Sequence, residues 1–104
     1  MADYVLLYSG GGMPETEAEQ AAVMKAWDDW YHELGGAIKD GGNPFGPAKT
    51  VGDGGAVSEG APGPHLTGYT VVTADSLDAA VTLAKGSPVL QGGGRVHVYE
   101  TMEM

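Results

Sequence analysis

The side chains in this sequence best suited to acid–base chemistry are its three histidines, because the charge of a histidine changes near neutral pH. His65 lies in a loop framed by proline and glycine, directly before an expected core strand, where loops often carry ligand contacts. His32 lies near the end of an expected helix, with Asp28 one turn before it. We interpret His65 and His32 as candidate catalytic residues. The alternatives are a turn-capping ring for His65 and an exposed surface pair with Asp28 or Asp29 for His32.

His97 lies between Val96 and Val98 in the last expected strand, so it should face the opposite side of the sheet from both valines. A hydrogen bond at a subunit interface is its simplest role. No two histidines have the spacing of a metal motif and the chain has no cysteine, so we predict no metal and no cofactor. The glycine run 10–12 lacks the remaining residues of a phosphate-binding loop and precedes three glutamates, which would repel phosphate.

Large aromatic side chains gather on the first expected helix, where Trp27, Trp30 and Tyr31 fall within about two turns. Core filling explains such a group by itself. Alternatively, aromatic walls with few polar groups suit a small organic ligand. We predict that Tyr8, Trp30 and Tyr69 line a pocket between this helix and the sheet, with the loop 43–47 as its lid or as a plain turn cluster.

The composition indicates a single domain over residues 1–104, with 42% hydrophobic and 18% charged residues, which argues against disorder. The net charge of −9 excludes a basic patch and therefore argues against nucleic acid as a partner. No segment is long and apolar enough for a membrane span or a signal sequence. We therefore expect a cytoplasmic protein without a membrane partner.

The chain reads as strands and helices separated by glycine-rich turns. The apolar run 4–8 predicts a strand buried on both faces. The first helix begins at Pro14 or, if Thr16 and Glu19 form a capping box, two residues later, and it ends at Gly35. Its apolar face comprises Val23, Trp27, Trp30 and Leu34. Further strands are expected at 37–39, 48–51, 56–58, 69–73 and 95–100, and a second helix, capped by Asp75 or Ser76, should bury Leu77, Ala80, Val81 and Ala84.

This order of elements predicts an α+β fold of the ferredoxin-like split βαβ type, with an antiparallel sheet and two helices on one face. No helix remains to cover the other face, although the strands carry apolar residues at adjacent positions. We therefore predict a homodimer that packs sheet to sheet.

Five blocks spread over nearly the whole chain carry a family resemblance. They are Tyr4–Tyr8, Trp27–Leu34, Leu66–Tyr69, Ser76–Ala80 and Val96–Tyr99. In this order they resemble the YCII-related family, which implies a ferredoxin-like protomer in a dimeric α+β barrel. One branch of that family has a proposed active-site histidine early in the first helix, whereas this helix has no histidine before His32. Another branch has Asp-Gly-Pro-Phe where residues 62–65 read Pro-Gly-Pro-His. The resemblance therefore implies the fold and assigns no catalytic residue here.

The first functional hypothesis is a small-molecule-binding protein or a weak enzyme, with its pocket between the first helix and the sheet. The alternative is a non-catalytic regulatory or protein-interaction dimer module, because no recognisable catalytic constellation is present. A third reading, by analogy with cofactor-free enzymes among the dimeric α+β barrels, rests on the fold alone.

Overall fold

The computed structural model describes residues 2–11 and 15–103. Within these ranges the helices are α1 (Glu17–Leu34) and α2 (Leu77–Ala84), with 3-10 turns η1 (Gly35–Ala37), η2 (Asp53–Gly55) and η3 (Pro88–Gly92). The strands are β1 (Ala2–Gly10), β2 (Ile38–Asp40), β3 (Lys49–Val51), β4 (Val57–Glu59), β5 (Leu66–Ala74) and β6 (Gly94–Glu100).

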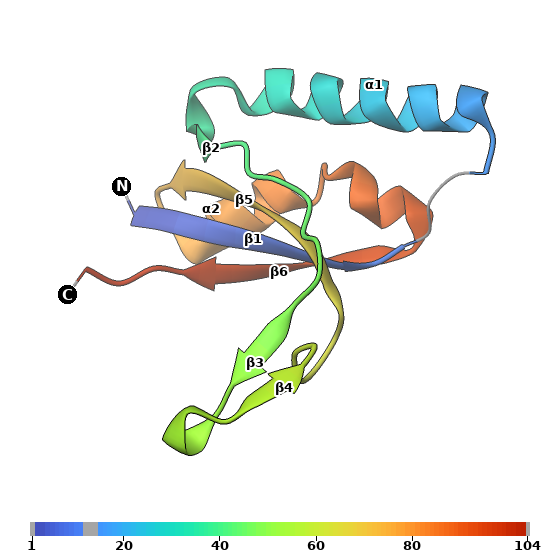
Figure 1. Ribbon diagram of the computed structural model, residues 1–104. Coiled ribbons are helices and arrows are strands. Elements are labelled where there is room, and N and C mark those ends of the chain that lie inside the picture. The colour runs from blue at the N-terminus through green and yellow to red at the C-terminus, as the bar shows by residue number, and fades with distance from the viewer. Residues whose placement is uncertain (1, 12–14, 104) are drawn as a thin grey trace.

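A four-stranded sheet with the order β2-β5-β1-β6 forms the body of the molecule. All of its neighbouring strands are antiparallel. Helices α1 and α2 lie on the same side of this sheet (Figure 1). Two strand–helix–strand units arranged in this way make a ferredoxin-like α+β fold, which confirms the prediction from the order of elements.

Alternate side chains of β1 point to opposite faces of the sheet. Tyr4, Leu6 and Tyr8 are buried beneath the helices. Val5 and Leu7 point to the other face, where they are only half-buried. The uninterrupted apolar run predicts burial on both faces, but within residues 4–8 only the side chains on the helix-covered face are fully buried.

The core lies between the two helices and the sheet. Trp30 and Leu34 of α1 and Ala80 and Ala84 of α2 are buried against it. The Trp30 indole Nε1–H donates a hydrogen bond of 3.2 Å to the Leu83 carbonyl, which links the two helices. Trp30 therefore packs in the core, which is the role that core filling predicts for it, and does not form a pocket wall.

Side-chain caps set the first residue of each helix. The Thr16 hydroxyl accepts a hydrogen bond of 3.1 Å from the Glu19 backbone N–H, so α1 begins at Glu17, as the capping-box alternative predicts. The other predicted start, Pro14, lies outside the described residues. Ser76 caps α2 in the same way through the Ala79 N–H. Leu77, predicted to be buried, is 43% exposed, because it lies in the first turn of α2 beyond the edge of the core.

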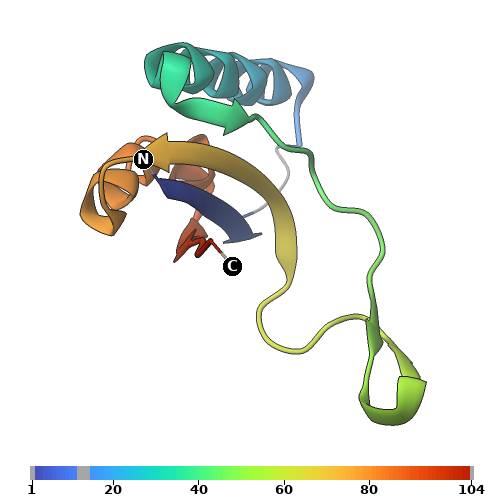
Figure 2. The same ribbon diagram turned by 90° about the vertical axis from the view of Figure 1, so that its left-hand side faces the viewer.

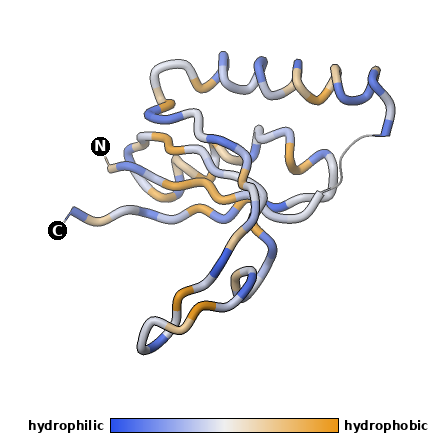
Figure 3. The backbone as a smooth tube through the Cα atoms, in the orientation of Figure 1, coloured by the Kyte–Doolittle hydropathy of each residue, from blue (hydrophilic) through white to orange (hydrophobic). Residues whose placement is uncertain are grey.

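Strands β3 and β4 form a separate two-stranded sheet that projects away from the body (Figures 1 and 2). We call residues 49–59 the hairpin arm. Its cross-strand pair Val51 and Val57 is 70% and 62% exposed, and Figure 3 shows apolar stretches on both of its strands. None of the residues 49–59 is buried within the part of the chain that the structure describes.

Neither α1 nor any other helix in the described ranges has the combined length and apolarity needed to cross a membrane.

Candidate functional site

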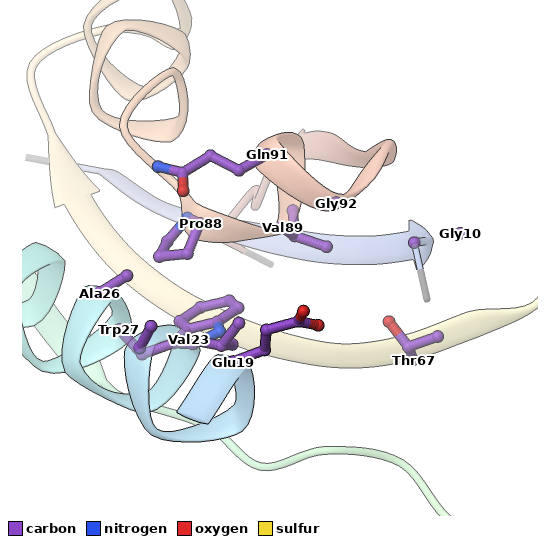
Figure 4. A pocket seen from close by; sticks show the side chains of 12 residues that line it. Gly10, Glu19, Val23, Ala26, Trp27, Thr67, Pro88, Val89, Gln91 and Gly92 are labelled. Carbon is purple, nitrogen blue, oxygen red and sulfur yellow. The ribbon is translucent and has the colours of Figure 1, made fainter. Parts of the chain in front are cut away.

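A cavity of about 580 Å³ lies beside the sheet, between the first half of α1 and the η3 turn (Figure 4). The end of β1 and the start of β5 close it from below. We call it the α1 cavity. Its lining residues are Gly10, Gly11, Glu19, Ala22, Val23, Ala26, Trp27, Thr67, Pro88, Val89, Gln91 and Gly92.

Helix α1 supplies one wall because Glu19, Val23 and Trp27 recur at four-residue spacing and therefore share one face. The sequence predicts this apolar face but does not tell which part of it is covered. In the structure Val23 is 39% exposed, because the first half of α1 extends beyond the contact that buries Trp30. The N-terminal part of the apolar face thus lines a cavity and the C-terminal part packs in the core.

The η3 turn supplies the opposite wall with Pro88 and Val89. The Ser87 hydroxyl accepts a hydrogen bond from the Val89 N–H, and Ser87 itself is 2% exposed. Gly94 lies so close beneath that an added Cβ would be 2.6 Å from a methyl of Val89. From the sequence, Gly86 and Pro88 predict the end of the second helix and no further turn. The Ser-Pro pair at 87–88 was the available signal, since proline is favoured in the first turn of a helix.

Trp27 forms the aromatic part of the lining. Its ring packs edge-on against Tyr8 at 5.3 Å and against Trp30 at 5.6 Å between centroids. It is tilted against Tyr31 at 5.9 Å. Neighbours on three sides fix the indole, so the half-buried ring presents a preformed apolar surface to the cavity.

The polar groups of the lining are few. In Figure 4 the Glu19 carboxylate points across the cavity mouth toward Thr67. The Thr67 hydroxyl donates to the Tyr8 carbonyl at 3.3 Å, which leaves its oxygen lone pairs available as acceptors. Gln91 adds an amide on the η3 side. Glu19 is the titratable side chain in the lining, so the arrangement suits binding better than proton shuttling between two groups.

The structure does not bring the five predicted site residues together. Tyr8 and Trp30 lie beneath the α1 cavity but do not line it. Tyr69 is opposite Leu7 in the β1–β5 register, so its ring is on the other face of the sheet from Tyr8. His65 is exposed in the loop before β5, and His32 is exposed on α1.

The predicted lid also lies elsewhere. Phe45 stacks on Tyr69 with centroids 5.7 Å apart, and its N–H donates to the Thr67 carbonyl at 2.8 Å. The loop 43–47 therefore runs along the edge of β5, because its backbone continues the pairing that β2 begins. The prediction that it covers a pocket against α1 is wrong.

Two buried tyrosines lie under the helices. Burial raises the pKa of Tyr8 strongly above its ordinary value, against a smaller lowering by the hydrogen bond to Thr70. The pKa of Tyr4 is raised by burial and by its hydrogen bond to Glu100. Both phenols are therefore neutral structural groups at physiological pH.

On the uncovered face of the sheet, Ser9 and His97 form a hydrogen bond of 2.7 Å between Oγ and Nε2. His97 is opposite Leu7 and faces away from its neighbours in β6, Val96 and Val98, as its position in the strand predicts. Among the described residues, no three metal-ligating side chains come together.

A second, smaller hollow of about 370 Å³ lies between α2, the η3 turn and β6. Its lining is apolar apart from Lys85 and includes the partly exposed Leu77 and Leu90. The polar groups that fix a ligand's orientation are fewer here than in the α1 cavity.

These features define the class of protein: a ferredoxin-like α+β fold with a preformed, mainly apolar cavity under its first helix. No family model matches the chain, and no curated protein matches it. Among solved structures it is similar to 5-chloro-2-hydroxyhydroquinone dehydrochlorinase (TftG) from Burkholderia phenoliruptrix, in complex with 2,5-dihydroxybenzoquinone. The two share 16% identity with a TM-score of 0.54, over 97% of this chain and 95% of that one. This likeness shows the fold.

Proposed function

We propose that this protein binds a small organic molecule in the α1 cavity. The observation that carries the proposal is a space of about 580 Å³ with the fixed indole of Trp27 in its wall and polar groups at its mouth. Ligand sites occupy roughly 300–1,000 Å³ and combine apolar walls with a few polar groups. The cavity is large enough for one or two fused aromatic rings.

The similarity in fold to a dehydrochlorinase solved with a quinone supports the choice of a ring compound as the first probe. We place binding ahead of catalysis, because the lining contains one titratable side chain, Glu19. A weak enzyme remains within the proposal if Glu19 acts as a general base toward a bound hydroxyl.

A cavity-filling pair of variants tests the proposal, with 2-naphthol as the probe. Ala22 lines the cavity, whereas Ala21 is exposed on α1 and does not. We expect 2-naphthol to raise the melting temperature of the native chain and of Ala21→Phe saturably, because binding to the folded state stabilises it. Ala22→Phe should lose the response. An equal response in both variants would place the binding site elsewhere.

His65 and His32 stay candidate acid–base residues, although both lie outside the α1 cavity. Neither side chain reaches the lining of this cavity. We therefore expect His65→Ala and His32→Ala to bind 2-naphthol as the native chain does. A loss of binding in either variant would mean that the ligand extends beyond the lining described above.

We also infer that the chain forms a homodimer through the uncovered face of the sheet. The half-buried apolar side chains Val5, Leu7 and Val71 on that face support this inference. Membership of the YCII-related family and a cytoplasmic location are proposed from the sequence alone. The alternative function, a protein-interaction dimer module, is favoured by the exposed valine pair of the hairpin arm.

A further inference from the structure

The charge at the mouth of the α1 cavity has one sign. Among its described lining residues the charged side chain is Glu19. The three ion pairs of the described chain join other residues, at Lys25–Asp29, Lys39–Asp3 and Lys49–Glu59. Glu19 is therefore a member of none of these three ion pairs. The net charge of −9 over the chain adds a background of the same sign.

The position of Glu19 on α1 is fixed by the backbone. Its N–H is held by the Thr16 hydroxyl, and its carboxylate points across the mouth toward Thr67 (Figure 4). An ionised carboxylate only accepts hydrogen bonds. A ligand group that meets Glu19 must therefore be a donor, such as a hydroxyl or an amine.

The rest of the lining selects for an apolar body. Val23, Trp27, Pro88 and Val89 face one another across the cavity. An aromatic ring fits against these surfaces, and the face of the Trp27 indole also attracts positive charge. A negative group gains nothing from this wall and is repelled by Glu19.

We propose that Glu19 makes the α1 cavity selective for neutral or cationic aromatic molecules with a hydroxyl or amine donor, and against aromatic anions. This inference rests on the proposed function. It also separates this chain from its structural neighbour, which was solved in complex with 2,5-dihydroxybenzoquinone, a vinylogous acid that ionises readily. We expect that compound to bind poorly here.

Two ligands of the same shape, one neutral and one anionic, test the selectivity. 6-Hydroxy-2-naphthamide and 6-hydroxy-2-naphthoate share the ring system and the hydroxyl donor. We expect the amide to bind the native chain about fivefold more tightly than the carboxylate, as for one unit charge beside another at a solvated site. The ratio should fall at high salt, because salt screens exposed charges.

Glu19→Gln removes the charge and keeps the shape, and Glu17→Gln is the matched control. Glu17 is exposed in the same helical turn and does not line the cavity. Calorimetric titration should give a ratio near one for Glu19→Gln and an unchanged ratio for Glu17→Gln.

The possible outcomes separate this inference from the function on which it rests. If both naphthalenes bind but the ratio is the same in native protein and Glu19→Gln, the selectivity role is wrong and the binding function stands. Tighter binding of the carboxylate to the native chain would also overturn the inference. If neither compound nor 2-naphthol binds, both proposals fail.

Discussion

At the scale of single residues, a chain of buried and partly buried hydrogen bonds lies beneath the α1 cavity. The Tyr8 hydroxyl donates to the Thr70 Oγ1 at 2.6 Å, and Thr70 donates to the Gly41 carbonyl at 3.1 Å. The Gly41 carbonyl also accepts from Tyr31 at 3.2 Å. Because Tyr8 packs against Trp27, this network fixes the aromatic wall above it.

Tyr8 should make the stability of the fold decrease at high pH. Its pKa is raised by burial, so above about pH 10 the unfolded chain loses a proton that the folded chain keeps. The folded state then binds more protons, and its stability falls as the pH rises. Urea unfolding of Tyr8→Phe should show a slope against pH that is shallower by up to about 1.4 kcal/mol per unit. Identical slopes for native protein and variant would show that Tyr8 ionises freely.

Gly42 should tolerate no side chain, because a Cβ atom there would collide with the backbone of Tyr69. This collision can be separated from the cost of its positive φ. Its φ is +76°, and an added Cβ would lie within bonding distance of the Tyr69 carbonyl. Gly54 has a similar φ of +69° with open space around it. Gly54→Ala should lower the free energy of unfolding by about 1 kcal/mol, and Gly42→Ala by roughly 3 kcal/mol or more. Equal losses in chemical denaturation would contradict the contact with Tyr69.

At the scale of elements, the hairpin arm is the part of the chain least supported by the body. An isolated two-stranded hairpin is marginal in water, and the side chains of Val51 and Val57 are mostly exposed. We expect the double variant Val51→Ser/Val57→Ser to change the free energy of unfolding by less than about 0.5 kcal/mol. Val72→Ala in the core, at 0% exposure, should lose about 2 kcal/mol. A large loss in the arm variant, dependent on protein concentration, would show instead that a partner covers the arm.

At the scale of the whole molecule, the uncovered sheet face is the basis of the dimer prediction. Leu7 lies at its centre, opposite both Tyr69 and His97. Light scattering should give twice the 10.7 kDa chain mass for the native protein and for Ala21→Glu on exposed α1. Leu7→Glu should give the monomer mass, because an unpaired buried charge is strongly unfavourable. A native monomer would refute the dimer.

The sequence predicted the architecture better than the site. Periodic apolar residues and side-chain caps identified both helices and the strands of the sheet, because these signals are local. The α1 cavity depends on how far α1 extends beyond the sheet and on the path of η3, which are properties of tertiary packing. The sequence marks Trp27 as part of an aromatic group, whereas it marks Glu19 only as a capping-box partner of Thr16. The sequence places Tyr69 in the same pocket as Tyr8 because it does not show the register of the two strands. The register decides which face of the sheet each ring occupies.

The most direct test of the account is whether a ring compound contacts Trp27. We would titrate ¹⁵N-labelled protein with 2-naphthol and follow the two tryptophan indole N–H signals. The Trp27 signal should shift saturably, and the Trp30 signal, held by the Leu83 carbonyl, should stay nearly unchanged. A titration that leaves the Trp27 signal in place at saturating 2-naphthol would contradict the proposed ligand site.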